Sequence, residues 1–232
     1  MAPALALSIV VPVGPGDEGW TGLLRDLAGC RADAELLLVA ARDAMPPAFT
    51  PSDYGLHIPA QWLDSAAGRA RQQNAGAARA RGDTLWFLHA DSRLSPETLA
   101  AAEGFAGQDA LGYFDLRFRD DGPALVRLNA LGARLRSRWL NLPFGDQGLM
   151  LPRRRFEAFG GFDERLECGE DHALVWAARR AGLPLVALGA PLWTSARRYA
   201  ERGWLRTTLQ HARLTIAQAR RFSARGKGQG AA

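Results

Sequence analysis

The chain has 232 residues, of which 47% are hydrophobic and 23% are charged, which suits one α/β domain with a substantial core. It contains no run of about 18 apolar residues, so we expect no transmembrane helix. The two cysteines, Cys30 and Cys168, lie far apart without CxxC spacing, which argues against a zinc site or a disulfide framework and suits a reducing cytoplasm. The first residues, MAPALALSIVVPV, have no positive charge before the apolar stretch, so we expect a strand there rather than a signal peptide.

Positive charge is concentrated toward the C-terminal end. The net charge is +5, but the segment from Ser195 onward contains nine basic residues and one acidic residue, Glu201, which leaves −3 on the rest of the chain. Such a segment can bind phosphates or an anionic membrane. A basic pI alone is weak evidence for nucleic-acid binding, and we expect no nucleic-acid partner.

Strand and helix patterns alternate along the first half of the chain. Apolar runs predict strands at 5–13, 35–40, 55–60 and 85–88, and helices are predicted at 19–29 and 65–81. Another helix opens at Ser95, which is a favoured N-cap residue and is followed by Pro96 and Glu97. This alternation is typical of βαβ units with a parallel sheet.

The second half is less regular. A strand with one solvent-facing side is predicted at 110–120, a helix at 123–140, a loop rich in Gly and Pro at 140–152 and a short helix at 156–164. A helix at 170–181 is followed by Gly182 and a strand at 184–188. An amphipathic helix is predicted at 203–222, and 225–232 is expected to be disordered.

The triplet His89-Ala90-Asp91 follows the buried apolar run 85–88. Ligands of open α/β sheets bind at the carboxyl ends of the strands. A carboxylate placed there, near an imidazole, can hold a divalent metal or a ribose. The alternative is a solvated loop aspartate after a core strand.

Four blocks of the sequence stand out: 68–83 running into 87–91, PFGDQGLML at 143–151, FGGFDE with GEDHAL within 159–174, and TSARRYAERGWLRTTL at 194–209. In this order and spacing they resemble family 2 glycosyltransferases, and in particular the small bacterial subgroup of radical-SAM/selenodomain-associated glycosyltransferase-like proteins. The resemblance implies a GT-A, Rossmann-like fold with a mostly parallel central sheet. It also implies an inverting glycosyltransferase that uses Mg²⁺ or Mn²⁺ and moves a sugar from a nucleotide-diphospho-sugar to an acceptor hydroxyl or a lipid phosphate. Residues 1–195 would form the GT-A domain and 196–224 a basic helical segment.

By this resemblance, Asp91 occupies the position that binds the metal, since the triplet stands where the family has a D-x-D motif. His89 replaces the first Asp, and it can contact the ribose, join the metal shell or merely fill space. Asp171 would be the general base, beside Glu170. The alternative for either residue of this pair is helix capping, because both stand at a predicted helix start.

Further residues are expected at the donor by the same resemblance. Family members have Arg before the Asn of the 68–83 block, whereas this chain has Gln73, so the phosphate contact would fall to Arg69 or Arg71. Asp146 and Gln147 are expected to bind the donor sugar or the acceptor, although a plain turn is the alternative. The whole set expected at the donor is Pro12, Asp43, Arg69, Arg71, Asn74, His89, Asp91, Asp146, Gln147, Arg197 and Arg198. The two last arginines would close over the diphosphate or else start a solvated surface.

Two rival functions stay open. A sugar-phosphate nucleotidyltransferase is disfavoured because the loop after the first strand, 14–19, has no Arg or Lys. A catalytically degenerate GT-A protein that binds a nucleotide or a partner is favoured by His89 and by the altered region 40–43.

The helix at 203–222 also has two interpretations. It either packs on the domain or attaches the protein to an anionic membrane, at the inner face of the cell membrane, where the acceptor would be lipid-linked.

Overall fold

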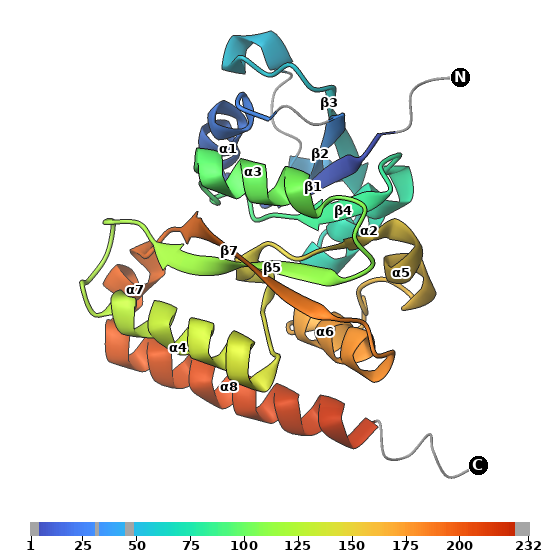
Figure 1. Ribbon diagram of the computed structural model, residues 1–232. Helices are drawn as coiled ribbons and strands as arrows, with labels where there is room; N and C mark the ends of the chain where they lie inside the picture. Colours follow the sequence, from blue (N-terminus) through green and yellow to red (C-terminus); the bar gives the residue numbers. More distant parts are fainter. Residues whose placement is uncertain (1–4, 31–32, 45–48, 226–232) are drawn as a thin grey trace.

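One seven-stranded sheet forms the centre of the computed structural model, which describes residues 5–30, 33–44 and 49–225 (Figure 1). Its strands are β1 (Leu7–Val13), β2 (Ala34–Ala41), β3 (Ala60–Ser65), β4 (Thr84–Phe87), β5 (Leu111–Phe118), β6 (Met150–Pro152) and β7 (Leu185–Thr194). The strand order is β3-β2-β1-β4-β6-β5-β7, and β6 alone runs antiparallel to its neighbours. The predicted mostly parallel central sheet is confirmed.

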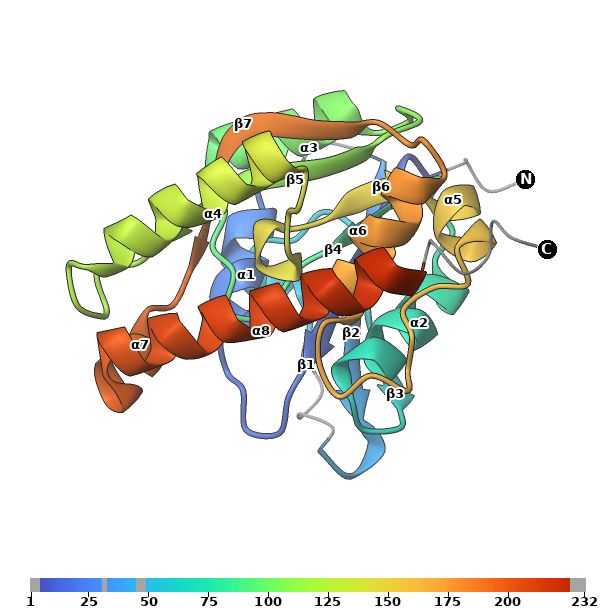
Figure 2. The same ribbon diagram turned by 90° about the horizontal axis from the view of Figure 1, so that it is seen from below.

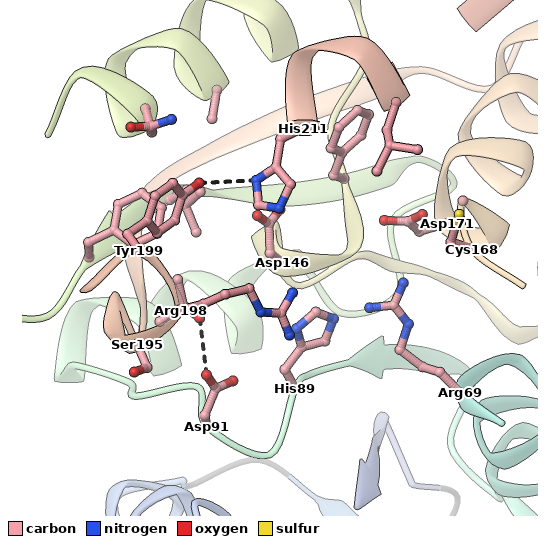
Figure 3. A pocket seen from close by; sticks show the side chains of 18 of the residues that line it. Arg69, His89, Asp91, Asp146, Cys168, Asp171, Ser195, Arg198, Tyr199 and His211 are labelled. Atoms are coloured by element: carbon pink, nitrogen blue, oxygen red, sulfur yellow. Dashed lines mark hydrogen bonds between the residues drawn. The ribbon is translucent and has the colours of Figure 1, made fainter. Parts of the chain in front are cut away.

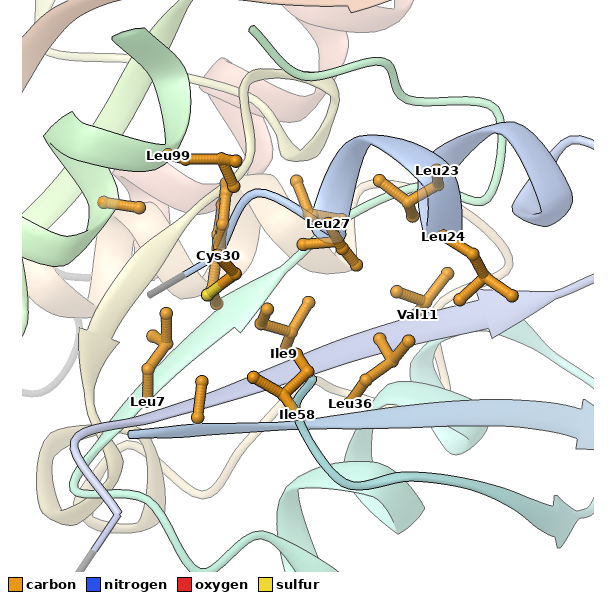
Figure 4. Close-up of a cluster of buried hydrophobic side chains, with 14 of the residues drawn as sticks. Leu7, Ile9, Val11, Leu23, Leu24, Leu27, Cys30, Leu36, Ile58 and Leu99 are labelled. Carbon is orange, nitrogen blue, oxygen red and sulfur yellow. The ribbon is translucent and has the colours of Figure 1, made fainter. Parts of the chain in front are cut away.

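Helices cover both faces of this sheet. Side chains of α1 (Trp20–Leu27) and α3 (Pro96–Phe105) belong to one core cluster, and those of α2 (Arg69–Arg79), α5 (Arg153–Ala158) and α6 (Glu170–Arg180) to another. Successive strand residues alternate between these clusters, because side chains of a strand point to opposite faces. Ile9 and Val11 pack with Leu23, Leu24 and Leu27 of α1 (Figure 4), whereas Val10 packs on the α2 side.

Two further helices lie outside these layers. They are α4 (Val126–Leu140), which packs on β5, and α8 (Trp204–Arg225), which follows the short α7 (Arg197–Arg202). Figures 1 and 2 show that α4 and α8 run in the same direction. Of the residues described, none belongs to a helix both long and apolar enough to cross a bilayer.

Several local predictions are confirmed. Ser95 caps α3 by accepting a hydrogen bond from the Thr98 N–H at 3.3 Å, with Pro96 in the first turn. Gly182 follows α6 with a φ of +68°, a backbone conformation that glycine adopts without strain. The helix predicted at 203–222 is α8. Residues 226–232 of the segment expected to be disordered lie outside the described residues, and Arg225 is the last residue of α8.

Some boundaries were predicted wrongly. The third strand is Ala60–Ser65, not 55–60, and Leu56 and Ile58 enter the core from a loop. This strand lies at the sheet edge and its side chains are intermediate or exposed, so it lacks a clear alternation. The short helix is Arg153–Ala158, not 156–164, because Gly160 and Gly161 both have positive φ. The predicted loop 140–152 also contains η3 (Gly145–Gln147) and β6.

Gly76 allows α2 to pack closely on the sheet. A Cβ added there would collide with Val10 Cγ1 and lie 3.1 Å from Val39 Cγ2. We expect Gly76→Ala to lower the free energy of unfolding by about 1–3 kcal/mol, because overpacking forces the core apart. Urea denaturation measures this change.

Gly104→Ala in α3 is the matched control, since no atom lies within 4 Å of an added Cβ. There we expect a gain of about 0.5–1 kcal/mol from the higher helix propensity of alanine. Equal effects at the two positions would contradict the close-packing explanation.

Candidate active site

A cavity of about 850 Å³ lies at the carboxyl ends of β1, β4, β5 and β7. Pro12 and Gly14 line it from β1, Leu116 and Phe118 from β5, and Thr194 from β7. Its remaining walls include side chains of α2, α4, α6, α7 and α8. This is the edge at which open α/β sheets bind ligands.

Eight of the residues expected at the site line this one cavity: Pro12, Arg69, His89, Asp91, Asp146, Asp171, Arg197 and Arg198. Asp91 and Asp171, which are 80 positions apart in the sequence, are among them, and Figure 3 shows them on opposite sides of His89. The structure therefore places in one cavity the two carboxylates that were expected from the sequence to bind a metal and to act as a base.

Asp91 is held in place just beyond β4. Gly19, before the first turn of α1, approaches so closely that a Cβ on it would lie 2.9 Å from Asp91 Cα. The Thr194 hydroxyl donates a long hydrogen bond of 3.4 Å to Asp91 Oδ2, and within the described parts of the chain no salt bridge involves this carboxylate. Asp91 thus offers hard oxygen atoms to the cavity.

The donor set fits a divalent cation that shares its ligands with a substrate. Among residues 5–30, 33–44 and 49–225, no three His, Cys, Asp or Glu side chains form a metal cluster. Mg²⁺ typically takes only one or two carboxylates from the protein and completes its shell with phosphate oxygens and water. One carboxylate, Asp91, beside a cavity lined by several arginines matches that pattern.

His89 is half-buried, two residues before Asp91. Its Nε2 atom has no hydrogen-bond partner among the described residues. Burial, together with the positive charge of Arg69, lowers the pKa of His89, so the imidazole is neutral at pH 7. A neutral imidazole with a free nitrogen can meet a ribose hydroxyl or a cation, and these two roles both remain predictions.

Asp171 stands in the first turn of α6, and both of its oxygens contact backbone groups. Oδ2 accepts from the Gly145 N–H at 2.5 Å, and Oδ1 accepts from the His172 N–H at 2.8 Å. The first contact reaches across to η3 and fixes the carboxylate at the cavity wall, so it does more than cap its own helix. Each oxygen keeps a second lone pair for an acceptor hydroxyl.

Glu170 points away from the cavity lining. Its side chain is 3% exposed and forms an ion pair with Arg69 of α2. Burial alone would lower the pKa of Arg69, but the hydrogen bond to Glu170 and the charge of Asp171 raise it above its ordinary value. These contacts favour a positioning role for Glu170, while its expected catalytic role stays a prediction.

Asp146, in η3, has a carboxyl group whose charged form is disfavoured by its surroundings. Burial raises its pKa, although the positive charge of Arg136 partly opposes this. Its Oδ1 atom finds no hydrogen-bond partner in the described structure. A buried carboxyl oxygen without a partner at a cavity wall is available to a substrate hydroxyl.

The adjacent Gln147 has the opposite environment. It is fully buried, its Nε2 donates to Phe114 O at 3.0 Å, and its Oε1 accepts from the Ser137 hydroxyl at 2.7 Å. These bonds join η3 to β5 and α4, so the amide supports the η3 loop rather than lining the cavity.

Asp43, Arg71 and Asn74 also lie outside the cavity lining. Asp43 is exposed in η1 (Arg42–Ala44). Arg71 lies 3.8 Å from Glu164, and Asn74 exchanges hydrogen bonds of 2.9 Å with the backbone of Phe162. Their expected donor contacts therefore stay predictions that this geometry does not favour.

Several cavity residues had not been predicted, notably Arg136, Tyr199, His211 and Gln218. The Tyr199 hydroxyl lies 3.1 Å from His211 Nδ1, and burial raises the pKa of Tyr199 to about 12. His211 and Gln218 are seven residues apart, on the side of α8 opposite Arg206, Arg213 and Arg220, and this spacing was the signal available in the sequence.

The comparisons with known proteins support the fold. No protein-family model and no curated protein matches this sequence. Its structure is similar to the mannosyltransferase PcManGT from Pyrobaculum calidifontis, solved with GDP-Man and Mn²⁺, with a TM-score of 0.67 and 18% identity over 95% of this chain and 65% of that one. It is also similar to S. aureus TarS in complex with UDP-GlcNAc, with a TM-score of 0.59 and 17% identity over 82% of this chain and 58% of that one.

The chain therefore has the GT-A fold of these glycosyltransferases and spans less than two thirds of the length of either. Both of these neighbours were solved with nucleotide sugars. The resemblance to the radical-SAM-associated subgroup is not tested by these structures and stays a prediction.

The raised pKa of Asp146 makes stability depend on pH. Its proton is bound more tightly in the folded than in the unfolded chain, so its contribution is fully present below the ordinary pKa of 3.8 and is lost as pH rises through the raised value. We expect Asp146→Asn, which cannot ionise, to melt at a higher temperature than wild type at pH 8. The difference should shrink toward pH 4.

Asp109→Asn is the control of opposite sign, because a hydrogen bond from Arg155 lowers the pKa of Asp109. That variant should lose stability relative to wild type as pH rises from about 2 to about 5, the window around the ordinary pKa of 3.8 in which the wild-type carboxylate ionises. Thermal denaturation from about pH 2 to about pH 8 measures both, and parallel curves for the two variants would refute the assignment at Asp146.

Proposed function

We propose that the protein is a metal-dependent, inverting glycosyltransferase that uses a nucleotide-diphospho-sugar. The single observation that carries this proposal is that Asp91 and Asp171 line one cavity at the carboxyl edge of a GT-A sheet. The nucleotide sugars bound to similar structures support the donor class, and Mn²⁺ in one of them supports a divalent ion.

The donor lies in the half of the cavity formed by β1 and β4. Asp91 would hold Mg²⁺ or Mn²⁺, whose chemistry when bound is to stabilise the negative charge of the diphosphate leaving group. Pro12 and Gly14 would face the nucleotide, and Arg69 and Arg198 would add positive charge along the diphosphate. His89 would lie between these groups, as the ribose contact or a further ligand.

The acceptor approaches from the side of α6. Asp171 takes the proton from the acceptor oxygen as that oxygen forms a bond to the anomeric carbon, while the bond from that carbon to the diphosphate oxygen breaks. A single displacement inverts the configuration and needs no covalent intermediate. The hydrogen bond from Gly145 fixes the position of Asp171, and the ion pair with Glu170 fixes the position of the Arg69 guanidinium. The base and this positive charge are therefore held in place relative to each other.

The acceptor class is a hydroxyl or a lipid phosphate. A lipid phosphate as acceptor would agree with membrane contact through the basic α8 and with a site at the inner face of the cell membrane. The rival function is a catalytically degenerate GT-A protein that binds a nucleotide. It is favoured by His89 in place of a family aspartate and by the engagement of both Asp171 oxygens with backbone N–H groups.

Removing the metal ligand should abolish metal-dependent donor binding. We expect UDP- or GDP-sugars with Mn²⁺ to raise the melting temperature of wild type, and Asp91→Asn to lose at least about tenfold in donor affinity, because one carboxylate to a hard cation is removed. Asp53→Asn, at an exposed position outside the cavity, is the control. Metal-independent donor binding by wild type would contradict the metal assignment.

Removing the base should separate binding from turnover. Asp171→Asn keeps the shape and the contact from Gly145, but it cannot accept a proton. We expect donor binding to remain and kcat to fall by about 10²–10⁴-fold, the usual contribution of general base catalysis. Nucleotide release in the presence of acceptor measures this. Donor binding without turnover in wild type, for every acceptor supplied, would instead support the degenerate protein.

A further inference from the structure

Exposed apolar side chains are concentrated on two helices. Trp139, at 77% exposure, and Leu205, at 60%, are the most exposed. Eleven large hydrophobic residues are exposed in the described part of the chain, and all except Trp193 lie on or beside α4 and α8: Leu125, Leu128, Leu131, Leu135, Trp139, Leu140, Leu205, Leu209, Leu214 and Ile216. A grouping of this kind marks an interaction surface, whereas single exposed leucines are ordinary.

On each helix most of these residues form one stripe. With 3.6 residues per turn, Leu128, Leu135 and Trp139 fall within about 40° of one another around α4. By the same geometry, Leu205, Leu209 and Ile216 fall within about 40° around α8. Neither stripe faces the cores of the domain. The buried positions in the described part of these helices are Val126, Ala133 and Ser137 of α4 and Thr207 and Phe222 of α8.

The two stripes face the same outer side. Asn129 of α4 donates to the Thr208 hydroxyl at 3.0 Å and accepts from Trp204 Nε1 at 2.7 Å, so the helices meet along this line. Around each helix, the buried residues lie on one side of this contact and the stripe on the other. The helices run in the same direction (Figures 1 and 2) and meet along this line of contact. The two stripes therefore lie on one face, and the buried residues of both helices lie on the other.

The charge on this face has one sign. α4 and α8 contain no Asp or Glu, but α4 has four arginines and α8 has five. Arg206, Arg213 and Arg220 follow the α8 stripe at intervals of seven residues, and Arg127 flanks the α4 stripe. All four are exposed, and within the described parts of the chain no salt bridge involves any of them.

We propose that the outer faces of α4 and α8 form a docking surface for an anionic bilayer. The leucines and Trp139 enter the boundary between headgroups and acyl chains, and the arginines meet the lipid phosphates. A second copy of the chain is the poorer occupant, because a symmetric contact would press the same acid-free, arginine-bearing helices against each other. A bilayer supplies both the apolar medium and the negative charge.

This surface deepens the proposed function and rests on it for the nature of the acceptor. The inner sides of the same helices line the cavity, through Ala133 and Arg136 of α4 and through His211 and Gln218 of α8. A docked bilayer would therefore lie about one helix diameter, roughly 10 Å, from the cavity. A lipid-borne phosphate could then reach Asp171 while its chain stayed in the membrane.

Vesicle co-sedimentation of the full chain tests the surface. We expect wild type to pellet with vesicles of phosphatidylcholine and phosphatidylglycerol at about 0.1 M salt, and less at about 1 M, where charges are screened over about 3 Å. Vesicles of phosphatidylcholine alone should bind it weakly. Each of Arg213→Gln and Arg220→Gln should lower the partition coefficient about fivefold, which corresponds to about 1 kcal/mol per basic residue. Leu128→Glu with Leu209→Glu should lower it at least about tenfold.

Arg25→Gln on α1 and Trp193→Gln on β7 are matched controls, since both residues are exposed and lie outside the surface. Far-UV circular dichroism and donor-induced thermal shifts show that each variant is folded. Equal pelleting of wild type and the Leu128/Leu209 variant overturns the proposal. So does a wild-type dimer in sedimentation velocity that the same substitutions dissociate while vesicle binding is absent. Vesicle binding without sugar transfer would leave the surface standing and count against the proposed function only.

Discussion

The ion pair between Arg69 and Glu170 joins the two halves of the cavity. Arg69 begins α2, which packs on β1 and β2, and Glu170 begins α6, which also carries Asp171. Glu170 is almost fully buried, and a buried carboxylate needs a partner to offset its desolvation. The two helices are therefore held together where they start, and the positive end of each points toward the cavity. The buried charge of Glu170 requires Arg69 as its partner, and this ion pair also fixes the start of α6, where Asp171 follows Glu170.

The antiparallel strand β6 is the second constraint. It lies between β4 and β5 and separates the first strands of the sheet from β5 and β7. The η3 loop that leads into β6 brings Asp146 to the cavity and brings the Gly145 N–H to Asp171. Gln147 anchors this loop through bonds to β5 and α4. A short strand thus links the side of the cavity at Asp91 with the side at Asp171.

The sequence predicted the central sheet well because its inner strands are continuous apolar runs. β1, β2 and β4 are buried along their whole length, so a run such as 85–88 has few other interpretations, and it located Asp91 at a strand end. The edge strand β3 was predicted at 55–60 instead of Ala60–Ser65, because it is only partly buried and its apolar pattern is weak. Asn74 and Gln147 matched family positions, yet in the structure both donate hydrogen bonds to backbone carbonyls of the protein. No local sequence pattern predicts these contacts. Tyr199 of α7 and His211 of α8 reach the cavity because the two C-terminal helices return over the domain, which is a tertiary effect. For His211 the only local sequence signal was its seven-residue spacing from Gln218.

Because α8 returns over the cavity, its inner and outer faces differ in character. A helix packed against a protein core usually has an apolar inner face and a polar outer face. In α8 this is partly reversed, since His211, Thr215 and Gln218 point inward to the cavity, whereas Leu205, Leu209 and Ile216 point outward. Polar residues on the inner side suit a helix that lines a hydrated cavity, and grouped apolar residues on the outer side favour a partner that removes them from water. α4 repeats this arrangement with Arg136 inward and Trp139 outward. Two helices with the same reversal, side by side over one cavity, would suit the proposed enzyme, which would take its donor from water and its acceptor from a bilayer.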